Sequence, residues 1–140
     1  MRTESILVVE DNPINLKLAF DVLEFEGYQM SSAEDAVTAR AIIRRTPPDL
    51  ILMDLALPGM DGLAFTRELK ADQATRHIGI VALTAFAMKG DDQKAKEAGC
   101  DGYITKPIST RKLPGQVAEL LGRRGKQVEA PLKHERPDCR

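Results

Sequence analysis

Short apolar segments rich in β-branched residues alternate with segments of helical periodicity along most of this sequence. Continuous apolar runs of this kind are typical of strands buried on both faces of a sheet. We predict strands over Ser5–Val9, Tyr28–Ser31, Leu50–Met53, Gly79–Leu83 and Tyr103–Thr105. Strands that alternate with helices are joined by right-handed crossovers. The alternation therefore predicts an α/β fold with a parallel sheet and helices on both of its faces.

The segments between these strands carry apolar residues at helical spacing. We predict helices over Ile14–Glu26, Glu34–Arg45, Asp61–Lys70, Ala87–Ala98 and Ser109–Leu121. Asn12 followed by Pro13 is typical of a helix start, because Asn caps the first turn and Pro fits the first helical position. Pro114 and Gly115 fall inside the last predicted helix, where both residue types disfavour regular helix.

The composition fits one globular domain. Of the 140 residues, 43% are hydrophobic, which fills one core but not two and argues against a two-domain enzyme. The longest apolar runs are strand-sized, and Met1 is followed by Arg-Thr-Glu rather than by the apolar run of a signal peptide. We therefore expect a cytoplasmic protein without membrane insertion. Cys100, Cys139, His77 and His134 lack the spacing of a disulfide framework or a zinc site.

The C-terminal residues differ in character from the rest. Residues 122–140 contain six Lys or Arg and three Asp or Glu, which gives a net charge of +3 and leaves −4 on residues 1–121. We predict one domain over residues 1–122 and a flexible basic tail over residues 123–140. This tail is either a solvated terminus or a basic docking segment. The overall charge of −1 indicates no nucleic-acid partner.

Polar side chains end four of the five predicted strands. Glu10 and Asp11 follow the first strand and Asp54 the third; Thr84 and Lys106 follow the fourth and the fifth. Ligands of open α/β sheets bind beyond the carboxyl ends of the strands, so we expect these groups to meet at one edge. Taken alone, each has an ordinary alternative: a helix cap, a solvated turn, a β-former or a surface lysine.

Three carboxylates at one sheet edge repel one another unless a cation compensates. Oxygen ligands of this kind fit Mg²⁺, and a nearby lysine then favours a phosphoryl group. Asp54 follows the most apolar strand, which makes it the best candidate nucleophile for forming an aspartyl phosphate. Glu10 and Asp11 would hold the metal together with the backbone carbonyl of Ala56. The hydroxyl and the ammonium that end the fourth and fifth strands would pair with phosphoryl oxygens.

Four segments resemble the receiver domain of bacterial two-component response regulators. They are ILVVEDN (6–12), DLILMDLALPGMDG (49–62), VALTAFA (81–87) and GYITKPI (102–108). Any one of them is a weak signal, but four in this order and spacing are specific, and the resemblance covers residues 4 to about 122. It implies a flavodoxin-like, CheY-like (βα)5 fold, with a doubly wound, five-stranded parallel sheet in the order 2-1-3-4-5.

Carried over residue by residue, the resemblance places a phosphorylation site in this sequence. It implies Asp54 as phosphoacceptor, Asp11 as a direct Mg²⁺ ligand and Glu10 as a ligand through water, with Mn²⁺ as a substitute metal. The remaining implied features are the backbone carbonyl of Ala56 as a metal ligand, Thr84 and Lys106 as phosphoryl-binding residues, Tyr103 as the aromatic switch that moves with Thr84, and a cis peptide bond between Lys106 and Pro107.

The resemblance also implies protein partners. A histidine kinase or a histidine phosphotransfer protein would present phosphohistidine, from which the receiver transfers the phosphoryl group to its own aspartate. The face of the fourth helix, fifth strand and fifth helix, with Met88, Lys89 and Tyr103, would then bind a downstream protein. Within the family, EDNPINLKL (10–18) and LTAFAMKGD (83–91) are similar both to single-domain regulators of bacterial cell-cycle and polarity signalling and to receivers of hybrid histidine kinases. A signalling protein is expected, not an enzyme that turns over a substrate.

Two side chains bear on how long such a phosphoryl group would last. In this family, the residues two positions after the phosphoacceptor and two after the threonine help to govern hydrolysis. They are Ala56 and Phe86 in this chain, and neither side chain hydrogen-bonds an attacking water. We therefore expect slow self-dephosphorylation.

Other functions remain open at this point. A phosphatase of the haloacid dehalogenase type also uses an aspartate nucleophile, but it needs a second Asp where this chain has Ala56. A flavodoxin-like FMN carrier needs a phosphate-binding loop after the first strand, where Glu10 and Asp11 would repel the phosphate. The chain also fits a receiver fragment of a hybrid kinase or of a larger regulator. Only 18 residues follow Gly122, too few for a helix-turn-helix domain.

Overall fold

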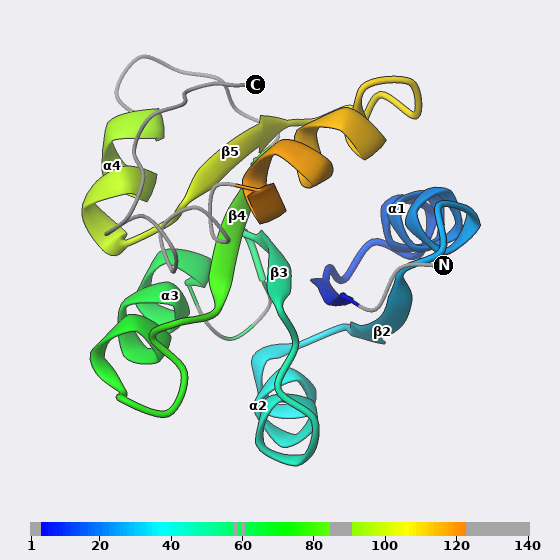
Figure 1. The fold of residues 1–140 in the computed structure, drawn as a ribbon. Helices are drawn as coiled ribbons and strands as arrows, with labels where there is room; N and C mark the ends of the chain where they lie inside the picture. The colour runs from blue at the N-terminus through cyan, green and yellow to red at the C-terminus, as the bar shows by residue number, and fades with distance from the viewer. Residues whose placement is uncertain (1–3, 58, 60, 85–90, 123–140) are drawn as a thin grey trace, which may run out of the picture.

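The computed structural model describes residues 4–57, 59, 61–84 and 91–122. Five strands form one parallel sheet in the order β2-β1-β3-β4-β5 (Figure 1). The strands are β1 (Ser5–Val9), β2 (Gln29–Ala33), β3 (Leu50–Asp54), β4 (Gly79–Thr84) and β5 (Gly102–Thr105). The helices are α1 (Pro13–Phe25), α2 (Ala36–Arg45), α3 (Gly62–Ala71), α4 (Asp91–Ala98) and a C-terminal helix over residues 113–122. The predicted fold class and strand order are confirmed.

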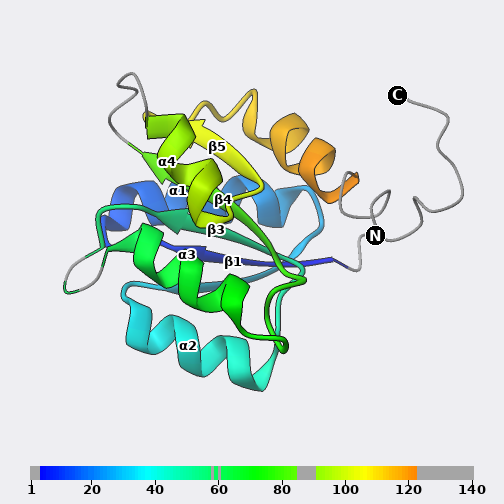
Figure 2. The same ribbon diagram turned by 90° about the vertical axis from the view of Figure 1, so that its left-hand side faces the viewer.

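The side-chain alternation along the buried strands divides the core between the two faces of the sheet. In β3, Leu50 and Leu52 pack toward α1 and the C-terminal helix, whereas Ile51 and Met53 pack toward α2 and α3. All five residues of β3 are buried, as expected for a strand covered by helices on both faces. Figure 2 shows α2 and α3 together on one side of the sheet and the C-terminal helix on the other.

Local caps determine where the first two helices begin. The side chain of Asn12 accepts hydrogen bonds from the amides of Ile14 and Asn15, and α1 begins at Pro13. The second helix starts at Ala36, two residues later than predicted, because Asp35 serves as its N-cap and accepts from the Thr38 amide at 2.8 Å. Both starts follow the physical rule that a side-chain acceptor satisfies the free amides of a first turn.

The limits of the second strand and the start of the last helix also shift in the structure. The second strand covers Gln29–Ala33 instead of Tyr28–Ser31, since its position follows from its pairing with β1, in which Val9 lies opposite Ala33. The last helix begins at residue 113 instead of Ser109, and residues 110–112 form a turn. Pro114 thereby falls in the first helical turn, where its missing N–H costs no hydrogen bond.

Some predictions concern residues that the structure does not describe. The predicted start of the fourth helix at Ala87 and the predicted tail over residues 123–140 both lie there. The described part of the fourth helix, α4, begins at Asp91. In the part of the chain that the structure covers, no helix is both long enough and apolar enough to cross a membrane.

Candidate phosphoacceptor site

The residues predicted to form a site follow the carboxyl ends of neighbouring strands, and backbone hydrogen bonds fix these ends relative to one another. The Leu55 amide donates to the Leu83 carbonyl at 3.0 Å, which ties the end of β3 to the end of β4. The Lys106 amide donates to the Thr84 carbonyl at 2.7 Å, which does the same for β4 and β5. The polar groups after these strands therefore converge because the sheet is parallel and in register, as expected for this fold class.

Three acidic side chains form a cluster at this edge. One carboxylate oxygen from each of Glu10, Asp11 and Asp54 lies within 4.8 Å of the others. Glu10 and Asp54 are buried, with 0% and 3% of their surface exposed, and Asp11 is exposed. Buried carboxylates this close together need a positive charge nearby to remain ionised.

Lys106 supplies one such charge. Its Nζ lies 2.8 Å from Glu10 Oε1 and 3.4 Å from Asp54 Oδ1, and its side chain is only 13% exposed. Lys106 thus links the carboxylate after β1 to the one at the end of β3. The peptide bond between Lys106 and Pro107 is cis.

Local hydrogen bonds orient both buried carboxylates. Glu10 Oε2 accepts from the Asn12 amide at 3.1 Å, in the same turn in which the Asn12 side chain caps α1. Asp54 Oδ1 accepts from the Ala56 amide at 3.0 Å. Each carboxylate therefore has one oxygen held by the backbone two residues ahead, which fixes its direction toward the sheet edge.

The environment of Glu10 and Lys106 indicates that one ammonium does not fully compensate the cluster. Burial raises the pKa of Glu10, and the Asp54 carboxylate adds to the rise, while the hydrogen bond with Lys106 opposes it without cancelling it. Burial alone would lower the pKa of Lys106, but the hydrogen bond with Glu10 and the charges of Glu10 and Asp54 raise it overall. Lys106 therefore stays protonated, and a further cation would stabilise the ionised form of Glu10.

The cluster has the chemistry of a hard divalent cation site. Its three donors are carboxylate oxygens, the ligand type that Mg²⁺ prefers. Glu10 Oε1 is fully buried, and within the described residues its contact with the Lys106 ammonium at 2.8 Å leaves acceptor capacity for a further cation. The exposed Asp11 gives an ion access from solvent. The residues present therefore fit Mg²⁺, while the metal role predicted for the Ala56 carbonyl stays a prediction.

The other predicted site residues differ in how the structure places them. Thr84 ends β4 and is 6% exposed at the same sheet edge. Tyr103 lies half-buried in β5, opposite Ala82 of β4. Phe86, predicted to influence hydrolysis, lies outside the described residues, as do Met88 and Lys89 of the predicted partner face.

One residue of this region was missed by the sequence interpretation. Gly62, the first residue of α3, is buried and its amide donates to the Leu55 carbonyl at 3.2 Å, directly behind Asp54. The dipeptide Asp61–Gly62 indicated a helix start, and Asp61 does cap α3. The close approach to β3 is a tertiary contact, so no local pattern could have predicted it.

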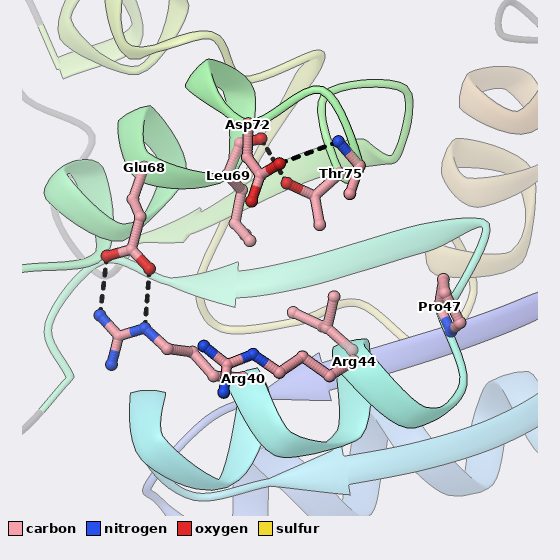
Figure 3. A pocket seen from close by; sticks show the side chains of 9 residues that line it. Arg40, Arg44, Pro47, Glu68, Leu69, Asp72 and Thr75 are labelled. Atoms are coloured by element: carbon pink, nitrogen blue, oxygen red, sulfur yellow. Dashed lines mark hydrogen bonds and ion pairs between the residues drawn. The ribbon is translucent and has the colours of Figure 1, made fainter.

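A separate hollow of about 330 Å³ lies between α2 and α3 (Figure 3). Arg40 spans it through two hydrogen bonds to Glu68, both 2.7 Å long, and its guanidinium lies over the Phe65 ring. None of its lining residues belongs to the carboxylate cluster. Arg40 and Glu68 therefore connect the two helices, and the hollow does not extend the site.

Comparison with known proteins agrees with this geometry. The response regulator receiver domain family matches residues 6–118. The polar-differentiation response regulator DivK of Brucella ovis is 43% identical over 120 residues, which span 86% of this chain and 98% of that protein. The chain therefore belongs to the response regulator receiver domain family.

Solved structures show the same fold with more distant sequences. The receiver domain of sensor histidine kinase PA1611 from Pseudomonas aeruginosa, crystallised with a magnesium ion in its active-site cleft, is 36% identical, with a TM-score of 0.77. The alignment covers 86% of this chain and 99% of that one. A response regulator from Chloroflexus aurantiacus is 27% identical with a TM-score of 0.82, over 87% of this chain and all of that one.

Family and site together define the class of activity. This is a DivK-like receiver-domain signalling protein, with the acidic cluster typical of a phospho-accepting site, and not an enzyme that turns over a substrate. A receiver domain implies a histidine kinase as partner.

Proposed function

We propose that this chain accepts a phosphoryl group on Asp54 from a phosphohistidine of a histidine kinase or a histidine phosphotransfer protein. The observation that carries the proposal is the environment of Asp54. It is buried at the end of an apolar strand, held by the Ala56 amide at 3.0 Å and lies 3.4 Å from the Lys106 ammonium. A desolvated carboxylate in fixed orientation beside a cation is suited to attack phosphorus, since phosphoryl transfer depends mainly on positioning and charge.

We assign Glu10, Asp11, Asp54 and the backbone carbonyl of Ala56 to a bound Mg²⁺, for which Mn²⁺ is a substitute. The magnesium ion in the related PA1611 receiver supports this assignment, as do the three clustered carboxylates of this chain. When bound, Mg²⁺ neutralises negative charge on the transferring group. Glu10 and Asp11 would hold the metal ion and balance its charge. The Asp54 oxygen that does not accept from the Ala56 amide is left to attack phosphorus.

The remaining residues act on the phosphoryl oxygens and on the output. We assign Lys106 Nζ and the Thr84 hydroxyl to two phosphoryl oxygens. Movement of Thr84 toward the phosphoryl group would let Tyr103 turn inward, changing the face of α4, β5 and the C-terminal helix. The backbone bond from the Lys106 amide to the Thr84 carbonyl supports this coupling, because it joins the two strand ends. A downstream protein would bind that face in one of its two states.

DivK supplies the best-supported biological role: phosphorylation-dependent protein contact in cell-cycle and polarity signalling within the cytoplasm. It rests on 43% identity over 98% of that relative. A second candidate is a receiver that serves a hybrid histidine kinase, and the 36% identity to the PA1611 receiver favours it. An aspartate-nucleophile phosphatase has less support, because Ala56 replaces the second aspartate that such enzymes use.

Intact-mass measurement with a small acyl phosphate and Mg²⁺ tests the proposal. The wild-type chain should gain one phosphoryl group, and Asp54→Asn should gain none while keeping its circular dichroism spectrum. An adduct of equal yield on Asp54→Asn, or no adduct on the wild-type chain, would contradict the proposal. Pull-down of partners with and without a phosphoryl mimic would then separate the two candidate roles.

A further inference from the structure

The start of α3 touches the main chain that carries Asp54, and it does so at a glycine. A Cβ atom added to Gly62 would lie 2.5 Å from the Asp54 carbonyl oxygen and 2.7 Å from Leu55 Cα. Both obstacles are backbone atoms, which cannot move aside by a change of rotamer. Any side chain at this position would therefore force α3 and the Asp54–Leu55 peptide apart.

The requirement for glycine here is one of space and not of backbone conformation. The φ angle of Gly62 lies outside the left-handed region, so alanine tolerates the local backbone. Gly102 offers a contrast at the start of β5, where an added Cβ would meet the end of the Leu120 side chain at 2.8 Å. That side chain has other rotamers, so the same degree of crowding at Gly102 is relieved without moving main chain.

We propose that Gly62 is a positioning residue for phosphoryl transfer, a role that rests on the proposed function of Asp54. The distance of 2.5 Å must open to at least 3.0 Å before a Cβ is accommodated. Part of that movement falls on the Asp54–Leu55 peptide. The movement would turn the Asp54 carboxylate and displace Ala56, whose amide orients that carboxylate at 3.0 Å.

Small displacements of this kind are costly for transfer because the reacting atoms must be held within a fraction of an ångström. A misplacement of about 1 Å lowers rates by roughly 100-fold. For Gly62→Ala we therefore expect a maximal phosphorylation rate lowered roughly 10- to 100-fold. The donor concentration at half-maximal rate should stay unchanged, since Gly62 does not touch the donor. Mg²⁺ should bind more weakly, because Asp54 belongs to the carboxylate cluster.

Gly102→Ala is the matched control, since it introduces similar crowding away from the cluster. Both variants are made in the full chain and compared in urea unfolding, in Mg²⁺ titration followed by NMR, and in phosphorylation rate against acyl phosphate concentration. The proposal expects Gly102→Ala to keep the wild-type rate within about two-fold and Gly62→Ala to lose rate even where both unfold at the same urea concentration. A wild-type rate in folded Gly62→Ala would overturn it.

A second pair of variants decides the matter if Gly62→Ala does not fold. The buried Thr66 hydroxyl donates to the Gly62 carbonyl at 2.9 Å and so holds the first turn of α3. Thr66→Val removes this bond at similar size and should lower the rate, whereas Thr66→Ser should restore it. A wild-type rate in Thr66→Val would then overturn the proposal. A wild-type chain that binds Mg²⁺ but takes up no phosphoryl group would refute the proposed function instead.

Discussion

Replacing Lys106 with methionine tests the electrostatic account of the site most simply. The substitution keeps an aliphatic side chain and removes the ammonium that lies 2.8 Å from Glu10 and 3.4 Å from Asp54. Two carboxylates with 1% and 4% side-chain exposure are then left without their cation. Breaking a buried pair by removing one partner costs about 3–5 kcal/mol. We expect a loss of about 3 kcal/mol at pH 7, near the lower limit, since Asp11 and the sheet edge are open to water.

The pH dependence of this loss follows from the direction of the Glu10 shift. The pKa of Glu10 is raised above its ordinary value of 4.5. A group with a raised pKa favours folding below its unfolded pKa, and this contribution is lost as the pH rises through the folded pKa. Without Lys106 the pKa of Glu10 rises further. The deficit of Lys106→Met should therefore be large at neutral pH and shrink as the pH falls toward 4.5.

Urea unfolding in EDTA, followed by circular dichroism, measures this loss at several pH values. Lys112→Met is the control, because Lys112 is exposed and, among the residues that the structure describes, forms no ion pair with the cluster. Added Mg²⁺ should restore part of the stability of Lys106→Met, since a ligand that binds only the folded state stabilises it. A loss below about 0.5 kcal/mol, typical of a surface substitution, would refute the account of a buried, compensated cluster.

Three further predictions concern other parts of the molecule. Asn12→Ala removes the cap that accepts from two amides of α1 and should cost about 1 kcal/mol in urea unfolding; an unchanged midpoint would count against the cap. Burial raises the pKa of the Cys100 thiol to about 11. The buried neutral thiol therefore favours the folded state below pH 9, and this stabilisation is lost as the pH rises toward 11. Cys100→Ala should flatten this decline in unfolding free energy, and an identical pH profile would argue against burial as its cause. The phosphoryl group on the wild-type chain should persist for minutes or longer in Mg²⁺, because Ala56 offers no side-chain hydrogen bond to an attacking water; decay within seconds by intact mass would contradict this.

The sequence predicted those features that depend on neighbouring residues. The start of α1 was predicted because Asn12 and Pro13 mark it locally. The sheet order came from the family resemblance, and the structure confirms it. The limits of β2 were wrong because its pairing with β1 leaves out Tyr28 and includes Ser32 and Ala33, and no strong apolar pattern marks those two residues.

Features that depend on tertiary approach were not predictable in the same way. Strand ends indicated that Lys106 and Glu10 share an edge, but their 2.8 Å contact depends on the placement of the whole sheet. The role of Gly62 depends on the distance between α3 and the Asp54 carbonyl, which no local pattern records. Periodicity and caps therefore predicted the helices and strands. The distances between the side chains of the site depend on tertiary packing.

The central claim is that Asp54 carries the phosphoryl group, and chemical trapping measures this most directly. Borohydride reduces an aspartyl phosphate to homoserine, which marks the modified position permanently. After treatment with a phosphorylated histidine kinase or an acyl phosphate and Mg²⁺, peptide mapping should find homoserine at position 54 and at no other aspartate. Homoserine at Asp11, or its absence from position 54 in a chain that has gained a phosphoryl group, would contradict the account.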